Sequence, residues 1–365
     1  MVVGIPDTNC GQTSPPLIAS QAFHSTKQPY LKYTIVMSDP ALIDPFQRQI
    51  EYLRISVTDR CDLRCTYCLP PGYKDFQEPT EWLTFDEITR VVDAFCALGA
   101  KRFRLTGGEP LTRRNIPELV SMLSAVDGLE DLSLSSNAVK LARYAEPLKA
   151  AGLNRVNISL DSLNPERFAT ITGGGKLQKV LDGLAAAKAV GLEPVKINMV
   201  VQAGVNDDEI SDMVEFCAER DYTLRLIETM PMGSTGLSAT STYRSLDSVM
   251  AELSEKLELI PDIMPGGGPA RYYRVAGSES RIGLITPISR HFCETCNRVR
   301  LGADGVLYMC LGQEHSFELR PLLRDGASRE ELMAAIRHAI TLKPERHEFK
   351  EKPDQIIRFM SQTGG

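Results

Sequence analysis

A strand-like run followed by a helix-like run occurs six times between residues 52 and 228, and this alternation constrains the fold more than any other feature. Repeated β/α units build a parallel sheet, because right-handed crossovers return each strand beside its predecessor. Six units are too few to close an eight-stranded barrel. The sequence therefore predicts an α/β fold, a partial (β/α)6 barrel of the TIM type. Its expected strands are residues 52–57, 102–105, 131–135, 155–159, 194–200 and 223–228.

The helices between these strands have recognisable boundaries. Thr84 and Glu87 predict a capping box, Asn164 precedes a proline that suits the first helical position, and Asn206 with Glu209 predicts a third helix start. Three glycines stand where a helix should end before the next strand: Gly99, Gly152 and Gly191. In such folds functional groups gather at the carboxyl ends of the strands, which is where the polar motifs of this chain lie.

We expect three segments. Residues 1–43 are rich in Pro, Ser, Thr and Gln without a sustained period, which predicts a disordered extension. Residues 44–248 hold the partial barrel, and residues 231–248 read as a polar connection. Residues 249–365 form a C-terminal region that we expect to pack across the open side of the barrel. Its predicted elements are a helix at 250–257, strands near 272–275, 283–285 and 299–301, and a late helix capped by Ser328 and Glu331.

Composition excludes several classes of protein. At 365 residues, 43% hydrophobic and 24% charged, the chain can bury a large core. The net charge of −6 argues against bulk nucleic-acid binding. Nine cysteines without a secretory signal indicate a reducing compartment, so we expect a cytoplasmic protein. No apolar run is long enough to span a bilayer, so no membrane association is expected.

Three cysteines, Cys61, Cys65 and Cys68, follow the first predicted strand. Thiolates at this spacing can hold three corners of an iron–sulfur cube, and with no fourth cysteine nearby one iron stays open to bind a substrate. The alternatives are a zinc knuckle lacking a ligand and a buried helical stripe. The polar residues Asp62 and Arg64 that interrupt the run argue against the stripe.

A second set of three cysteines, Cys293, Cys296 and Cys310, lies near the C-terminus. A second open cluster is one interpretation. Zinc with a fourth ligand from His291 or His315 is the other. Between these cysteines Arg298 and Arg300 alternate as in a strand, so both guanidiniums should lie on one face and suit an anion or a purine. A solvated strand face is the alternative for this pair.

These motifs together carry a family resemblance. The Cys-x3-Cys-x2-Cys run with Tyr67 before its last cysteine resembles the radical S-adenosylmethionine (SAM) enzymes. Joined to Cys-x2-Cys-x13-Cys, to Arg-Val-Arg and to the terminal Gly364-Gly365, it closely resembles the GTP 3′,8-cyclase family of molybdenum cofactor biosynthesis. Further matching runs are residues 53–61, 104–111, 157–161 and 225–230. A radical SAM enzyme that modifies peptides, with an auxiliary cluster, is the alternative.

The resemblance implies cofactors and roles. Two [4Fe-4S] clusters are expected, one on Cys61, Cys65 and Cys68 and one on Cys293, Cys296 and Cys310. SAM would contact Tyr67, Gly108, Ser159 and Met230. GTP would contact Arg54, Arg104, Ser135, Lys196, Arg298, Val299 and Arg300. Catalytic roles fall to Arg298, Arg300, Gly364 and Gly365.

The implied reaction is that of a lyase. A deoxyadenosyl radical from SAM removes the 3′ hydrogen of GTP, and the C3′ radical attacks C8 of guanine. Reduction of the resulting base radical by one electron, with uptake of a proton, gives (8S)-3′,8-cyclo-7,8-dihydroguanosine 5′-triphosphate. The resemblance also implies an electron donor and hand-over of the product to cyclic pyranopterin monophosphate synthase. A homodimer is compatible with the sequence.

Overall fold

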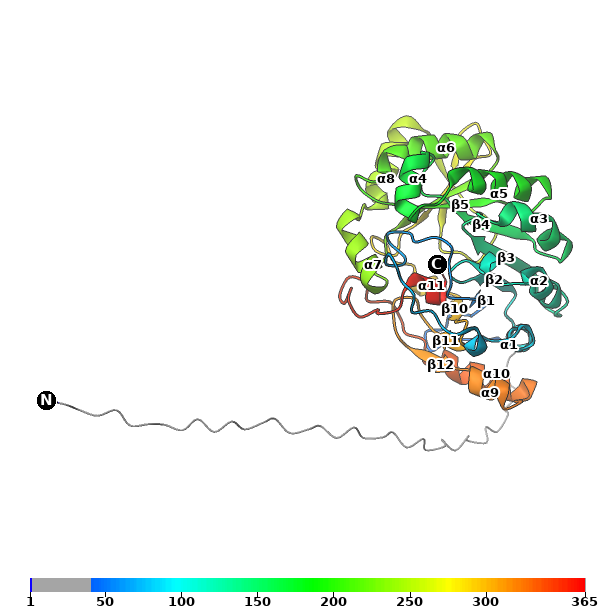
Figure 1. Ribbon diagram of the computed structural model, residues 1–365. Helices are drawn as coiled ribbons and strands as arrows, with labels where there is room; N and C mark the ends of the chain where they lie inside the picture. The colour runs from blue at the N-terminus through cyan, green and yellow to red at the C-terminus, as the bar shows by residue number, and fades with distance from the viewer. Residues whose placement is uncertain (2–40, 365) are drawn as a thin grey trace. The chain divides into compact units, whose positions relative to one another are not determined.

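Six parallel strands run side by side in chain order and form the centre of the molecule (Figure 1). The computed structural model describes Met1 and residues 41–364, so the predictions for most of the N-terminal extension and for Gly365 lie outside the described residues. The six strands are β1 (Tyr52–Ser56), β2 (Arg102–Thr106), β3 (Asp131–Ser136), β4 (Arg155–Ser159), β5 (Lys196–Val201) and β6 (Thr223–Glu228). All were predicted to within two residues.

Helices cover the outer face of this sheet, as crossover connections require. They are α1 (Phe85–Ala97), α2 (Ile116–Ser124), α3 (Leu141–Ala150), α4 (Pro165–Thr172), α5 (Leu177–Ala189) and α6 (Ile210–Glu219). No strand of the described chain pairs the two edges of the sheet, so the barrel stays open. The predicted α/β partial barrel is confirmed.

The C-terminal region lengthens the sheet at both edges. Strand β10 (Arg298–Leu301) pairs parallel with β1, and β9 (Arg281–Ile285) pairs parallel with β6. Antiparallel strands continue outward: β11 (Val306–Tyr308) and β12 (Ser316–Glu318) beyond β10, β8 (Arg271–Val275) and β7 (Leu259–Asp262) beyond β9. The positions of β8, β9 and β10 were predicted, whereas β7, β11 and β12 were not, nor was the place of these strands in the same sheet. The division at residue 248 stays a prediction, since one sheet of twelve strands crosses it.

The predicted helix boundaries are mostly right. The capping boxes at Thr84 and Ser328 are both formed, and the Asn164 side chain accepts from two backbone N–H groups of α4. Gly99, Gly152 and Gly191 have φ of 87°, 103° and 72°, the left-handed conformation of a helix C′ residue. The late helix is α10 (Arg329–Ile340), preceded by α9 (Arg320–Arg324).

Two predictions about helices were wrong. Asn206 does not cap α6, because its amide donates to the carbonyls of Asp161 and Val200 instead, and a 3-10 turn precedes the helix. The segment read as a polar connection holds helix α7 (Gly233–Ala239) before α8 (Leu246–Lys256). Within residues 41–364 no helix has the length and apolar character needed to cross a membrane.

The two faces of the sheet differ in chemistry. Outward side chains such as Leu53, Ile55 and Phe103 are fully buried beneath the helices and form the hydrophobic core. Inward side chains at alternate positions of the same strands are polar or charged, for example Arg54, Arg104 and Lys196. The interior of the barrel is therefore a site and not a second core.

Candidate active site

Three arginines stand abreast on neighbouring strands inside the barrel. In the sheet register Arg54 of β1 lies opposite Arg300 of β10 on one side and Arg104 of β2 on the other. Neighbouring strands are about 5 Å apart, so like charges in this row repel one another. Burial, and then the guanidiniums of Arg300 and Arg104, lower the pKa of Arg54 well below its ordinary value. Such a row is stabilised by an anion lying across it.

Further cations surround the row. Lys196, Arg225 and Arg298 are 4%, 4% and 7% exposed. In the described part of the chain no carboxylate forms an ion pair with these three, nor with Arg104 or Arg300. Burial, then the neighbouring Arg225, lowers the pKa of Lys196 to about 7. The interior therefore carries a large uncompensated positive charge, which suits a polyanionic ligand.

A cavity joins Arg225 and Arg298 to the second set of cysteines. Its volume is about 120 Å³, and its lining includes Arg54, Arg104, Arg298, Arg300, Met230, Cys293, Cys296 and Cys310. Polar atoms without a hydrogen-bond partner are buried in its wall: the Tyr52 hydroxyl, the Nε atoms of Arg225, Arg298 and Arg300, and Nε2 of His347. Buried donors of this kind are expected to meet a ligand.

Sequence reasoning missed several of these residues. Arg225 was quoted in a matching run without a role, although it has the same parity on β6 as Lys196 has on β5, and its Nη2 donates to Asn157 at 2.5 Å. Tyr272 of β8 places its ring 5.5 Å from the Lys196 ammonium. Alternation along β6 was the signal that could have identified Arg225. Nothing local indicated Tyr272.

The first cysteine set lies on the loop after β1, held by the turn after β2. The N–H of Gly108 donates to Thr58 O at 2.8 Å, and a Cβ on Gly108 would stand 2.3 Å from Arg60 O. Glycine is therefore required here by backbone packing, and the contact of Gly108 with SAM stays a prediction. Burial, and then the carboxylate of Glu109, raise the pKa of Cys61 to about 12.

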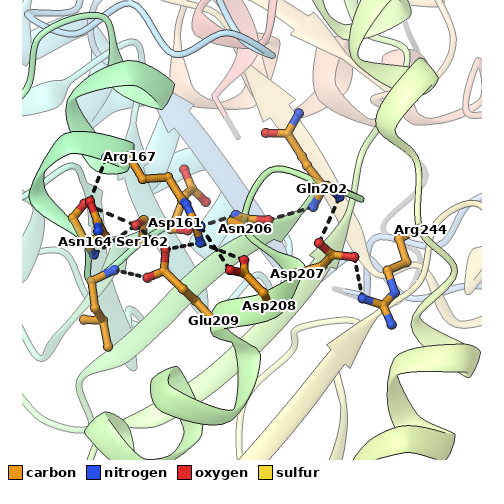
Figure 2. A network of polar contacts seen from close by, with 12 residues as sticks. Asp161, Ser162, Asn164, Arg167, Gln202, Asn206, Asp207, Asp208, Glu209 and Arg244 are labelled. Carbon is orange, nitrogen blue, oxygen red and sulfur yellow. Dashed lines mark hydrogen bonds and ion pairs between the residues drawn. The ribbon is translucent and has the colours of Figure 1, made fainter.

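Tyr67 is fixed by a buried polar network at the carboxyl ends of β4 and β5. Its hydroxyl donates to Asp161 Oδ2 at 2.6 Å, and Asp161 Oδ1 accepts from the N–H of Val200 at 2.8 Å. Figure 2 shows the rest of this network, in which Asn206 spans both strand ends and Glu209 accepts from the Ser162 hydroxyl. Burial raises the pKa of Asp161 to about 6. The network holds the cysteine loop against the barrel.

The C-terminal tail passes between the two cysteine sets. Arg358 donates to the carbonyls of Leu311 and Gln313 at 2.7 and 2.9 Å, beside Cys310. Helix α11 (Met360–Thr363) follows, and the backbone N–H of Ser361 donates to the Cys68 thiol. Helix α11 packs against β1 (Figure 1).

The remaining predicted residues are divided between the two faces. Ser135 has a buried hydroxyl without a partner on the inner face, and Ser159 is exposed at the end of β4. Val299 is fully buried in the outer core, on the face opposite Arg298 and Arg300, so its side chain lies away from the cavity. The predicted contact of Val299 with GTP would therefore be made by its backbone atoms. The roles of these residues stay predictions.

Both cysteine sets carry the thiolate ligands of an iron–sulfur cube, in which each thiolate binds a separate iron. Among the described residues no group of three His, Cys, Asp or Glu side chains is placed to hold a single metal ion. N–H groups also point at the sulfurs, from Leu63 to Cys61 at 3.4 Å and from Lys343 to Cys296 at 3.6 Å. Burial opposes ionisation of Cys296, but Lys343 and Arg298 lower its pKa to about 7.

Comparison with known proteins agrees with this geometry. The radical SAM superfamily profile matches residues 55–217, and the Molybdenum Cofactor Synthesis C profile matches residues 222–349. The GTP 3′,8-cyclase of Hydrogenovibrio crunogenus is 46% identical over 332 residues, covering 89% of this chain and 100% of that protein. GTP 3′,8-cyclase 2 of Pseudomonas aeruginosa is 48% identical over 90% of this chain and 100% of its own.

Solved structures share the architecture. Streptococcus suis SuiB bound to S-adenosylmethionine matches with a TM-score of 0.55, covering 86% of this chain and 77% of that one. At 13% identity this likeness concerns the fold alone. The identity to the curated relatives, in contrast, extends over about nine-tenths of the chain and their full length. By this similarity the chain belongs to the GTP 3′,8-cyclase family of radical SAM enzymes.

Proposed function

We propose that the protein converts GTP to (8S)-3′,8-cyclo-7,8-dihydroguanosine 5′-triphosphate, an early step of molybdenum cofactor biosynthesis. The observation that carries the proposal is the row Arg300, Arg54 and Arg104, which lines one cavity together with Cys293, Cys296 and Cys310. A triphosphate carries about four negative charges, and burying it requires several cations with good hydrogen-bond geometry.

The cofactors are two [4Fe-4S] clusters and SAM, and when bound they supply the radical chemistry. Cys61, Cys65 and Cys68 would hold the first cluster beside SAM, with Tyr67, Gly108, Ser159 and Met230 around it. Cys293, Cys296 and Cys310 would hold the second cluster next to the guanine. Met230, which is expected to contact SAM, lines the same cavity as Arg298, and this supports neighbouring positions for the two ligands.

The protein's own share is binding, orientation and exclusion of water. Arg54, Arg104, Lys196 and Arg225 would grip the triphosphate on the inner faces of β1, β2, β5 and β6. Arg298 and Arg300 would extend this anion site toward the second cysteine set, where the guanine end would lie, because their strand continues from that set. Fixing both ends of the nucleotide sets C3′ and C8 at reacting distance, which is where positioning lowers the barrier most.

A peptide substrate is the weaker alternative. A peptide brings no charge of this size, and the buried cations would then stay uncompensated. The two cases separate in one experiment. Anaerobic titration of GTP into the iron-loaded protein should give binding that fails in the Arg104→Ala variant. Absence of GTP binding by the wild-type protein would return the peptide alternative.

The remaining partners belong to the same proposal. The product would pass to cyclic pyranopterin monophosphate synthase, an electron donor would reduce the first cluster, and the protein would work in the cytoplasm. The proposal includes a homodimer on one ground, which is that the sequence is compatible with such an assembly. The negative net charge favours a small-molecule substrate held in a cationic interior over a nucleic acid on the surface.

A further inference from the structure

Lys343 is a buried ammonium group with all of its donors engaged. Its side chain follows α10, and the residue is 3% exposed. Nζ lies 3.0 Å from the carbonyl oxygen of Arg298, 2.8 Å from that of Met309 and 3.6 Å from Sγ of Cys296. An ammonium has three N–H donors and no acceptor, so these three contacts account for it.

The charge of Lys343 has no carboxylate to balance it. Within residues 41–364 no Asp or Glu forms an ion pair with this lysine. Two of its three acceptors are neutral carbonyls, and the third is a cysteine sulfur. A buried ammonium is costly unless an anion faces it. Of the three acceptors, the sulfur of Cys296 is the one that carries negative charge when it ligates iron, and it lies 3.6 Å from Nζ.

The first cysteine set has different surroundings. Its charged neighbours include the buried carboxyl groups of Asp161 and Glu109, which are 2% and 1% exposed, together with the side chains of Asp62 and Arg64. The donors that reach its sulfurs include the N–H of Leu63 at 3.4 Å from Cys61 and the side-chain amide of Asn137 at 4.0 Å from the same sulfur. Lysine contact with a cysteine sulfur is therefore a property of the second set in the described part of the chain.

We propose that Lys343 is the electrostatic partner of the second cluster and raises its reduction potential through a charge-assisted N–H···S contact to Cys296. Reduction adds an electron to the cluster, and a fixed positive charge beside a ligand sulfur stabilises that more negative state. Hydrogen bonds to the sulfurs and local charge are the levers by which proteins set cluster potentials. The inference rests on the second cluster of the proposed function and is independent of the substrate.

The test is a redox titration of iron-loaded, full-length protein followed by electron paramagnetic resonance, in the absence of GTP and SAM. Lys343→Met removes the charge and the donors, and Lys343→Gln removes the charge but keeps a donor. Lys343→Arg keeps both. Lys352→Met is the matched control, because Lys352 is 60% exposed and pairs with Glu348 on the surface.

We expect the potential of the second cluster to fall in Lys343→Met and, by less, in Lys343→Gln. Lys343→Arg should restore it, and the first cluster and Lys352→Met should not change. A second-cluster potential equal to wild type in both neutral variants would overturn the proposal. If neither neutral variant binds the second cluster, the Lys343→Arg variant decides. Binding of the second cluster by Lys343→Arg supports the proposal, and absence of the second cluster from Lys343→Arg overturns it. Because no GTP is present, these results are separate from any failure of the cyclisation reaction.

Discussion

Gly364 packs directly against Thr106 at the carboxyl end of β2. A Cβ built on Gly364 would stand 2.1 Å from Thr106 Cγ2, a separation that no real pair of carbons has. The φ of Gly364 is also +72°, in the left-handed region that favours glycine. The tail thus reaches the inner end of the barrel only because this residue has no side chain.

The Gly364→Ala variant should therefore lose cyclisation of GTP. Displacing the tail by about 1 Å is enough to cost roughly 100-fold in rate when it supports a positioned substrate. Deletion of Gly364 and Gly365 should have the same effect. Fold, iron content and basal SAM cleavage should survive, as measured by thermal melting, iron analysis and 5′-deoxyadenosine production.

Gly204→Ala is a matched control for this change. Gly204 has nearly the same φ, +70°, but no atom lies within 4 Å of the position that a Cβ would take, so the variant carries the backbone strain without the clash. It should keep its activity. A Gly364→Ala protein that forms the cyclic nucleotide at the wild-type rate would show that the tail is passive.

Replacement of Cys61, Cys65 or Cys68 by alanine should abolish SAM cleavage and leave the second cluster in place. The first set follows β1. In the second set Cys293 and Cys296 precede β10, and Cys310 follows β11. Anaerobically loaded wild-type protein should contain about eight irons per chain and each variant about four. Normal 5′-deoxyadenosine production by any of the three variants would contradict the assignment.

Arg298→Ala and Arg300→Ala should weaken GTP binding without loss of iron. Both side chains are buried and face the cavity, and truncating a buried charge that meets an anion costs roughly 2–5 kcal/mol. Calorimetric titration measures this directly. Arg329→Ala is the control, since its exposed pair with Asp93 is worth about 1 kcal/mol or less. Wild-type affinity in both cavity variants would place this pair outside the substrate site.

GTP affinity should depend on pH through Lys196. Burial, together with Arg225, lowers the pKa of this lysine to about 7, so the free protein loses the ammonium as the pH rises through that value. GTP favours the charged form and should bind with proton uptake, weakening about tenfold per pH unit above about pH 7. The Lys196→Arg variant stays charged at these pH values. The titration of the GTP phosphates affects both proteins equally, so it cancels in the ratio of the GTP affinity of the variant to that of the wild-type protein. A ratio that is constant with pH would exclude this role.

Much of the barrel was predictable because its signals are local. Inner and outer residues alternate along each strand, and caps such as Thr84 and Asn164 mark the helix starts. Helix α7 escaped detection because Gly233 and Gly236 lower its intrinsic propensity. Its position depends on a distant contact, in which Gly233 accommodates the ring of Phe359.

The site was predictable where the chemistry repeats a known motif and unpredictable where it depends on pairing. The six cysteines and the individual arginines were predicted from the sequence and the resemblance. Pairing of β10 with β1, which places Arg300 beside Arg54, joins segments far apart in the chain and has no local signal. Lys343 reads as an ordinary lysine after a helix until the fold brings it to Cys296.

The most direct test of the proposed reaction follows the hydrogen atom at C3′ of GTP. Anaerobic turnover with GTP carrying deuterium at C3′, with SAM and dithionite, should yield the 3′,8-cyclic nucleotide together with 5′-deoxyadenosine that contains the deuterium. That result requires the nucleotide in the cationic cavity to lie within reach of SAM at the first cysteine set. Formation of 5′-deoxyadenosine without deuterium, and without the cyclic nucleotide, would contradict the central claim that this cavity cyclises GTP.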